Sequence, residues 1–201
     1  MEILSAELDE IEDFNAEMFD FKLPEIDLKD YYGDERERTF NYYNLHVAHE
    51  IEHTDDFWEM PIIKKCDFIP QRLIGFNYAK SSDDKNTGLH CFIDDYQFER
   101  LWNDPYKYIE VLKPYECFLS PDFSLYTDMS EAMRIWNTYR SRLIGAFYQQ
   151  QGITVIPTVS WCERPTFKYC FKGIEKGGVV AISTIGVKED DDAFKIWKDG
   201  T

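Results

Sequence analysis

The chain has 201 residues, of which 44% are hydrophobic and 16% aromatic, so it is long and apolar enough to fold around one good-sized core. This composition excludes a disordered chain. No apolar run approaches the roughly 18 residues of a membrane span, and the acidic N-terminus MEILSAELDE differs from the basic start of a signal peptide. We therefore expect a soluble, cytoplasmic protein without membrane contacts.

The cysteines indicate the same compartment. They are odd in number, show no C-x-x-C spacing and fall mostly in apolar stretches: Cys66, Cys91, Cys117, Cys162 and Cys170. This pattern predicts buried, reduced thiols instead of a disulfide framework.

The formal net charge of -16 is concentrated in one part of the chain. Residues 1–60 hold 19 Asp and Glu against 4 Lys and Arg, which gives -15, whereas residues 61–201 hold 19 against 18, which gives -1. An acidic field repels nucleic acid phosphates and attracts basic protein surfaces or cations. We expect an acidic N-terminal arm at 1–60, an α/β domain at 61–201, and no direct binding of nucleic acid.

The start of the arm has the pattern of an amphipathic helix. Apolar residues recur at helical steps from near Ser5, and acidic residues occupy the opposite face. The apolar stripe comprises Leu4, Leu8, Ile11, Phe14 and Met18, and the acidic face comprises Glu7, Asp9, Glu10, Asp13 and Glu17. The stripe packs either into the chain's own core or against a partner. A solvated, solubilising segment is the alternative.

The stretch HEIEH fits the H-E-x-x-H pattern of zinc peptidases, in which two histidines one helical turn apart hold the metal and the Glu activates water. The candidate residues are His49, Glu50 and His53. Against this interpretation, a catalytic zinc needs a third ligand, and only His46 and His90 remain. The alternative is a surface helix whose Glu and His residues face water, with at most a weak metal site.

From about residue 61, strand and helix patterns alternate. Strands are expected at 89–93, 116–120, 153–161 and 177–186. Helical spacing follows at 97–112, at 129–147 closed by Gly152, at 167–174, and after Asp190 to Asp192. Consecutive βα units without a Rossmann glycine fingerprint predict a parallel sheet, either half of a (β/α)8 barrel or a small doubly wound sheet.

Ligands of such sheets bind beyond the carboxyl ends of the strands. The polar and aromatic residues expected at that edge are Asp94, Asp95, Ser120, Asp122, Ser124, Tyr126, Thr158, Ser160, Trp161, Ser183 and Thr184. Asp94, Asp95 and Asp122 could converge to hold a divalent cation or to form an acid and base pair. The competing interpretation is that they cap helices and fix loops. Trp161 is either a platform for a sugar or base, or a core residue.

Four long segments, FIDDYQFERLW, LSPDFSLYTDM, VIPTVSW and GGVVAISTIG, resemble the hallmark segments of a domain-of-unknown-function family numbered 4417, found in bacteria, phages and mobile elements. The resemblance runs from about Ile69 to Gly186. It implies a shared α/β fold and an origin in a mobile element, and it implies no mechanism. The acidic arm lies outside it.

Two functions remain open. The preferred hypothesis is an accessory protein, not an enzyme, that binds a host protein with a basic surface through its acidic arm in the host cytosol. The exposed edges of a short parallel sheet also favour a homodimer. Inhibition of a host defence system by competition with nucleic acid is one concrete form. The binding residues are then Leu8, Glu10, Ile11, Asp13, Phe14 and Glu17, together with Trp161. The alternative is a metal-dependent hydrolase of phosphoesters or glycosides that uses the three aspartates; the first hypothesis needs no cofactor.

Overall fold

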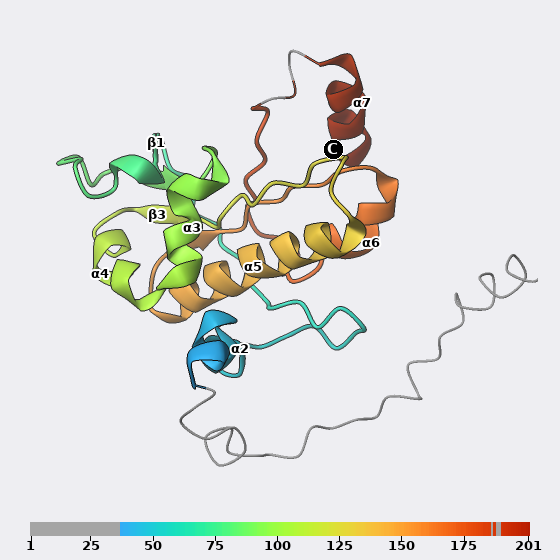
Figure 1. The fold of residues 1–201 in the computed structure, drawn as a ribbon. Helices are drawn as coiled ribbons and strands as arrows, with labels where there is room; N and C mark the ends of the chain where they lie inside the picture. The colour runs from blue at the N-terminus through green and yellow to red at the C-terminus, as the bar shows by residue number, and fades with distance from the viewer. Residues whose placement is uncertain (1–36, 186, 188–189) are drawn as a thin grey trace, which may run out of the picture. The chain divides into compact units, whose positions relative to one another are not determined.

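Four short strands form an all-parallel sheet in the order β1-β2-β3-β4. The computed structural model describes residues 37–185, 187 and 190–201 (Figure 1). The strands are β1 Leu73–Gly75, β2 Gly88–His90, β3 Cys117–Leu119 and β4 Val155–Ile156, and each neighbouring pair is parallel. The α/β class and the parallel sheet are confirmed, although β1 was not predicted.

The segment predicted as the last strand lies beside the end of β4 without forming a regular ladder. Ala181 pairs with Thr158 in a single parallel bridge. Its amide donates to the carbonyl oxygen of Pro157 and its carbonyl accepts from the amide of Val159, both at 2.8 Å. Because Pro157 has no N–H to donate, a continuous ladder cannot form at this position.

The helices follow the strands in the predicted order. They are α2 Leu45–Ala48, α3 Asp95–Asn103, α4 Ile109–Leu112, α5 Glu131–Gln150, α6 Phe167–Cys170 and α7 Asp191–Gly200, with helical residues also at 37–42 and 3-10 turns η3 Phe76–Tyr78, η4 Tyr106–Tyr108 and η5 Arg164–Thr166. The single helix expected at 97–112 is interrupted at Asp104, which has a non-helical ψ of 78° because Pro105 follows it.

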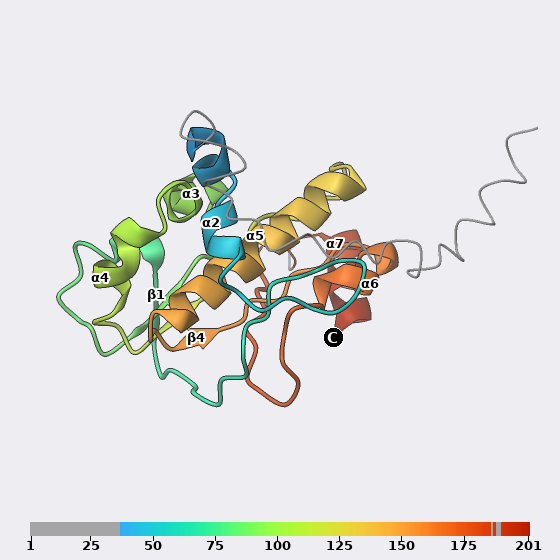
Figure 2. The same cartoon turned by 90° about the horizontal axis from the view of Figure 1, so that it is seen from below.

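The two faces of the sheet are covered differently. The main core joins Leu89, Phe118 and Val155 of the strands to apolar residues of α3, α4 and α5. The opposite face carries a smaller cluster, in which Cys117, Leu119 and Ile156 meet Cys66 and the segment 179–181. This second cluster contains no helical residue among those described, which favours the half-barrel arrangement over a doubly wound sheet (Figures 1 and 2).

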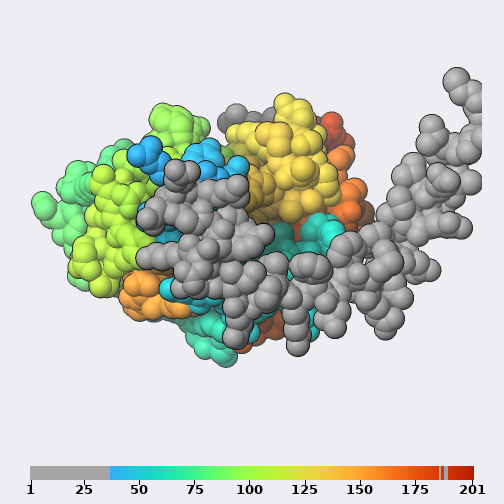
Figure 3. All heavy atoms as spheres, turned by 60° about the horizontal axis from the view of Figure 1, so that its bottom comes forward, coloured from blue at the N-terminus to red at the C-terminus, as the bar shows by residue number. Residues whose placement is uncertain are grey.

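The long helix α5 is confirmed, but its buried face differs from the predicted one. Leu143 and Phe147 are buried, as expected, whereas Met133 and Trp136 are 52% and 38% exposed. The first half of α5 instead buries polar residues: Arg134, Asn137, Thr138, Ser141 and Arg142. The first half of α5 lies beside the segment around α2 (Figure 3). The rings of Tyr43 and Trp136 form a T-shaped pair there.

Candidate functional site

A cavity of about 540 Å³ opens at the carboxyl edge of the sheet. Its walls come from the segments after β2, β3 and β4, from α7, and from Ile182, Ser183, Ile185 and Val187. The predicted edge residues that line it are Asp94, Asp122, Ser124, Tyr126, Ser160, Trp161 and Ser183. A cavity of this size fits the usual range for small-molecule sites, about 300–1,000 Å³.

Asp122 is the carboxylate on which the site centres. It follows β3, is partly buried, and accepts a hydrogen bond from Ser160 Oγ after β4. Burial raises the pKa of Asp122 to about 6, and the nearby charge of Asp95 adds to the rise, while Ser160 and the more distant Arg142 oppose it. This carboxyl group can therefore take up or release a proton near neutral pH.

Asp95 fixes a loop. Its Oδ2 accepts from the amide of Ser124 (3.1 Å) and its Oδ1 from Ser124 Oγ (2.8 Å). The neighbouring Asp94 precedes α3 and is exposed, and among the described residues its side chain accepts one long bond, from Gln97 Nε2 to Oδ2 (3.3 Å). The three aspartates therefore reach the same edge with different partners. For Asp95 the contacts are those of the loop-fixing alternative.

The polar face of α5 holds the rim loop, residues 121–128, in place. Arg134 Nε donates to the carbonyl oxygen of Tyr126 (3.0 Å) and its Nη2 to that of Thr127 (2.7 Å). Asn137 Nδ2 donates to the carbonyl oxygen of Ser124 (2.7 Å). Arg140 in turn donates to Asn137 Oδ1 (2.7 Å) and lies 3.8 Å from the ring centre of Phe123. Satisfied backbone groups leave this loop few other conformations.

Arg142 is fully buried behind Asp122. Its guanidinium donates to the carbonyl oxygens of Lys172 (2.9 Å), Thr158 (2.9 Å) and Cys170 (2.6 Å), and so ties α6 to the end of β4. Burial lowers the pKa of Arg142 to about 10, which leaves it charged at neutral pH. Within the described part of the chain it forms no ion pair, so carbonyl dipoles solvate this buried cation.

Sequence reasoning missed these α5 residues. The signal was present, because positions 134, 137, 138, 141 and 142 recur at helical spacing, so that polar side chains share one face of the helix. Because charged residues are usually exposed, the spacing alone does not indicate that this face is buried.

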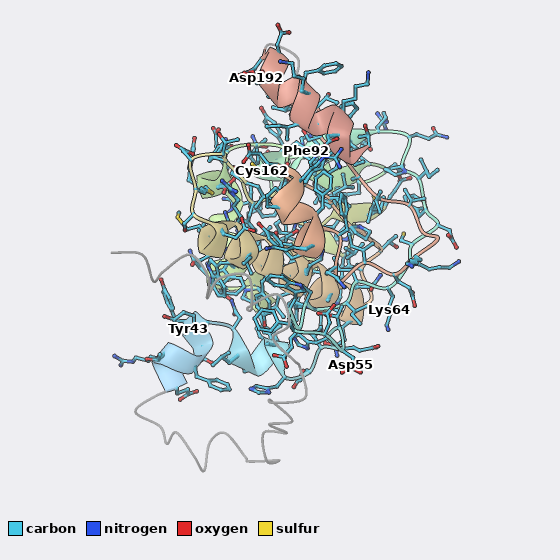
Figure 4. The ribbon with its side chains drawn as sticks, turned by 90° about the vertical axis from the view of Figure 1, so that its right-hand side faces the viewer. Tyr43, Asp55, Lys64, Phe92, Cys162 and Asp192 are labelled. Atoms are coloured by element: carbon cyan, nitrogen blue, oxygen red, sulfur yellow. The ribbon has the colours of Figure 1, made fainter. Side chains whose placement is uncertain are left out.

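The far wall of the cavity is α7, which carries Asp192 above the labelled Phe92 and Cys162 (Figure 4). Two indole groups attach this helix. Trp161 Nε1 donates to the carbonyl oxygen of Ile196 (3.0 Å), and Trp197 Nε1 donates to that of Ser183 (3.1 Å). Trp161 therefore both lines the cavity and bonds to α7, and its side chain is only partly buried.

The structure corrects the helix expected through HEIEH. Helix α2 ends at Ala48, His49 is its C-cap, and His53 pairs with Pro61 in an isolated bridge. The ring of His53 faces the carbonyl oxygen of Ile51 at 2.8 Å. The one-turn geometry of a zinc peptidase helix is thus not formed.

Within residues 37–201, apart from the three undescribed positions, no group of three or more His, Cys, Asp or Glu side chains is placed to hold a metal ion. The same region includes no helix with the length and hydropathy to cross a bilayer. The arm residues Leu8, Glu10, Ile11, Asp13, Phe14 and Glu17 lie outside the described residues. The compact unit that contains the cavity comprises residues 40–201.

Comparison with known proteins identifies the family. Residues 52–201 match the family described as Domain of unknown function (DUF4417). The chain belongs to this family. Two curated relatives are phage proteins, each named Gene 1 protein. That of Mycobacterium phage L5 is 41% identical over 162 residues, covering 78% of this chain and 69% of the relative.

The Gene 1 protein of Mycobacterium phage D29 is 39% identical over 134 residues, covering 65% of this chain and 50% of the relative. The chain thus spans between half and about two thirds of the length of these DUF4417 relatives. No solved structure matches the chain.

Proposed function

We propose that the cavity is a small-molecule site in which Asp122 exchanges a proton with the bound molecule during its hydrolysis. The observation that carries this proposal is the partly buried carboxyl group of Asp122, whose pKa of about 6 suits a general acid or base at neutral pH. Ser160 orients the carboxyl group through its hydrogen bond. The fixed rim loop presents Ser124 and Tyr126 to the ligand.

The charge of the lining favours one of the two substrate classes considered from the sequence. The described residues that line the cavity include four aspartates and no Lys, Arg or His. A phosphoester would bring negative charge beside Asp94 and Asp122 without a cation to offset it. A glycoside carries no such charge, and carboxyl groups are the usual catalytic groups for it. The substrate class that we propose is therefore a glycoside.

The test compares the complete chain with Asp122→Asn on a panel of chromogenic glycosides and, separately, aryl phosphates, with and without added Mg²⁺. We expect glycoside hydrolysis that falls at least a hundredfold in Asp122→Asn. The matched control is Asp83→Asn, which removes one charge from an exposed position in the loop before β2. Equal rates for the wild type and Asp122→Asn would refute the role of Asp122, and hydrolysis of aryl phosphates alone would refute the substrate class.

The arm supports a second candidate function. We propose that residues 1–60, with a net charge of -15, bind a basic surface on a host protein. The phage origin of the two relatives supports a host partner, and competition with nucleic acid for that surface would inhibit a host defence protein. Affinity capture from host lysate at 50 and 300 mM salt tests this. We expect a partner that is lost at high salt and on deletion of residues 1–20 but retained by Asp122→Asn. Capture that does not depend on the arm would refute it.

A further inference from the structure

The cavity also indicates the charge of its ligand. We infer that the molecule bound there is an organic cation, with an ammonium or guanidinium group attached to an apolar portion. This inference rests on the proposed function. This deepens the proposal above, because it selects amine-bearing substrates within the glycoside class. The inference follows from the charges, the aromatic residues and the buried groups around the cavity.

Carboxylates dominate the charge of the lining. Among them, Asp192 is paired with Lys195 Nζ at 2.8 Å, on the exposed side of α7. Asp94, Asp122 and Asp190 form no ion pair within the residues described. Asp190 caps α7 by accepting from the amides of Asp192 and Ala193, so the helix terminus offsets part of its charge. The charges of Asp94 and Asp122 remain to attract a cation.

Four aromatic residues also line the cavity: Phe92, Tyr126, Trp161 and Trp197. Both indole N–H groups already donate to backbone carbonyls, so the two tryptophans have fixed orientations and no free donor for a ligand anion. Aromatic rings attract organic cations through their quadrupoles, with tryptophan the strongest. The combination of aromatic rings with carboxylates is therefore suited to an alkylammonium group and poorly suited to an anion.

Among the described residues, no Lys, Arg or His side chain lines the cavity, so no cation of the protein there neutralises the carboxylates. The charge of Arg142 acts on Asp122, but Arg142 is 1% exposed and its guanidinium donates to carbonyl oxygens behind the site. A neutral ligand that displaced water from the carboxylates would compensate their desolvation only through its hydrogen-bond donors, without neutralising their charge. A cationic ligand provides that compensation when it binds.

The test uses three indole compounds of similar shape: tryptamine as the cation, tryptophol as the neutral analogue, and indole-3-propionate as the anion. Titration of the ¹⁵N-labelled complete chain follows the indole signals of Trp161 and Trp197, and calorimetry gives Kd. We expect tryptamine to bind about tenfold or more tightly than tryptophol, which corresponds to about 1.4 kcal/mol. Indole-3-propionate should bind more weakly than either.

Asp94→Asn identifies the source of the preference, because Asp94 is exposed and holds no structural contact beyond Gln97. We expect it to lower the preference for tryptamine over tryptophol at least threefold, while Asp83→Asn leaves the preference unchanged. Equal binding of tryptamine and tryptophol would overturn the charge inference and leave the proposed site intact. If no compound shifts either indole signal at millimolar concentration, both the inference and the proposed site are refuted.

Discussion

The two walls of the cavity are held in different ways. The rim loop is fixed by Asp95 and by the buried polar face of α5, through hydrogen bonds from Arg134 and Asn137 to backbone carbonyls. The opposite wall, α7, has no buried residue in its ten positions. It is attached by two indole hydrogen bonds and by an exposed ion pair between Arg164 and Asp199 (2.5 Å).

The two walls therefore contribute different kinds of groups to ligand binding. Groups that must be placed accurately, such as Asp122 and Ser124, come from the firm wall, where local unfolding costs a large part of the global stability. Groups that enclose a ligand, such as Trp197, come from the weakly attached wall. Elements of low local stability adapt to a ligand more readily than a packed core does.

The largest expected effect comes from Arg142, which ties α6 to the end of β4. Arg142→Met keeps a long side chain but removes the donors that satisfy three carbonyl oxygens, of which those of Thr158 and Cys170 are buried. We expect the free energy of unfolding to fall by about 3–5 kcal/mol. Denaturant unfolding measures this loss. Arg142→Lys should recover part of it, because one ammonium group can reach only some of the carbonyls. A loss below about 1 kcal/mol would show that the link from Arg142 to α6 and the end of β4 contributes little to stability.

The next largest expected effect is a pH dependence of the free energy of unfolding, caused by Asp122. Its folded-state pKa of about 6 lies above the ordinary value of 3.8, so folding favours the protonated form. The resulting stabilisation is complete below about pH 4 and is lost as the pH rises through 6. We expect the free energy of unfolding of the wild type, relative to Asp122→Asn, to fall by up to about 3 kcal/mol between pH 4 and 7.5.

Chemical denaturation at several pH values, with Asp83→Asn as the variant of equal charge change, separates this effect from general titration. Asp83→Asn should follow the wild type at every pH. A difference between the wild type and Asp122→Asn that stays constant from pH 4 to 7.5 would mean that the Asp122 carboxyl group is not perturbed by the site.

Much of this arrangement was predictable from the sequence, because it depends on local patterns. Apolar runs followed by Asp or Ser predicted β2, β3 and β4. The αL glycine Gly152 predicted the C-terminus of α5, and the capping residue Asp190 predicted the N-terminus of α7. Strand β1 was missed because three residues, of which Leu73 is 42% exposed, are too few to show a pattern.

The rest could not be predicted because it depends on tertiary contacts. Burial of a charged side chain is decided by distant partners: the carbonyls that accept from Arg142 lie 16 to 30 residues along the chain. Ser124 and Asp95 are likewise 29 residues apart. The sequence therefore identifies the edge where the cavity lies, but it does not show which of the three aspartates fixes the loop and which faces the cavity.

Asn137 links α5 to the rim loop, and its replacement should have an intermediate effect. Asn137→Ala removes the bond to the Ser124 carbonyl oxygen and the bond from Arg140. We expect a loss of about 2 kcal/mol in the free energy of unfolding, since both partners are then left without this contact. Asn103→Ala, at an exposed position in α3, should change stability by less than about 0.5 kcal/mol. If both variants lose the same amount, the rim loop is not held by α5.

The smallest effect is expected where α7 is attached at the surface. Arg164→Gln removes the ion pair with Asp199, in which the arginine side chain is 76% exposed. Exposed pairs of this kind contribute little because water and salt screen them, so global stability should change by less than about 0.5 kcal/mol. Hydrogen exchange should nevertheless become faster for the amides of α7 and remain unchanged in α5. If exchange accelerated in α5 as well, the two walls would unfold as one unit, and the contrast between a firm and a weakly attached wall would not hold.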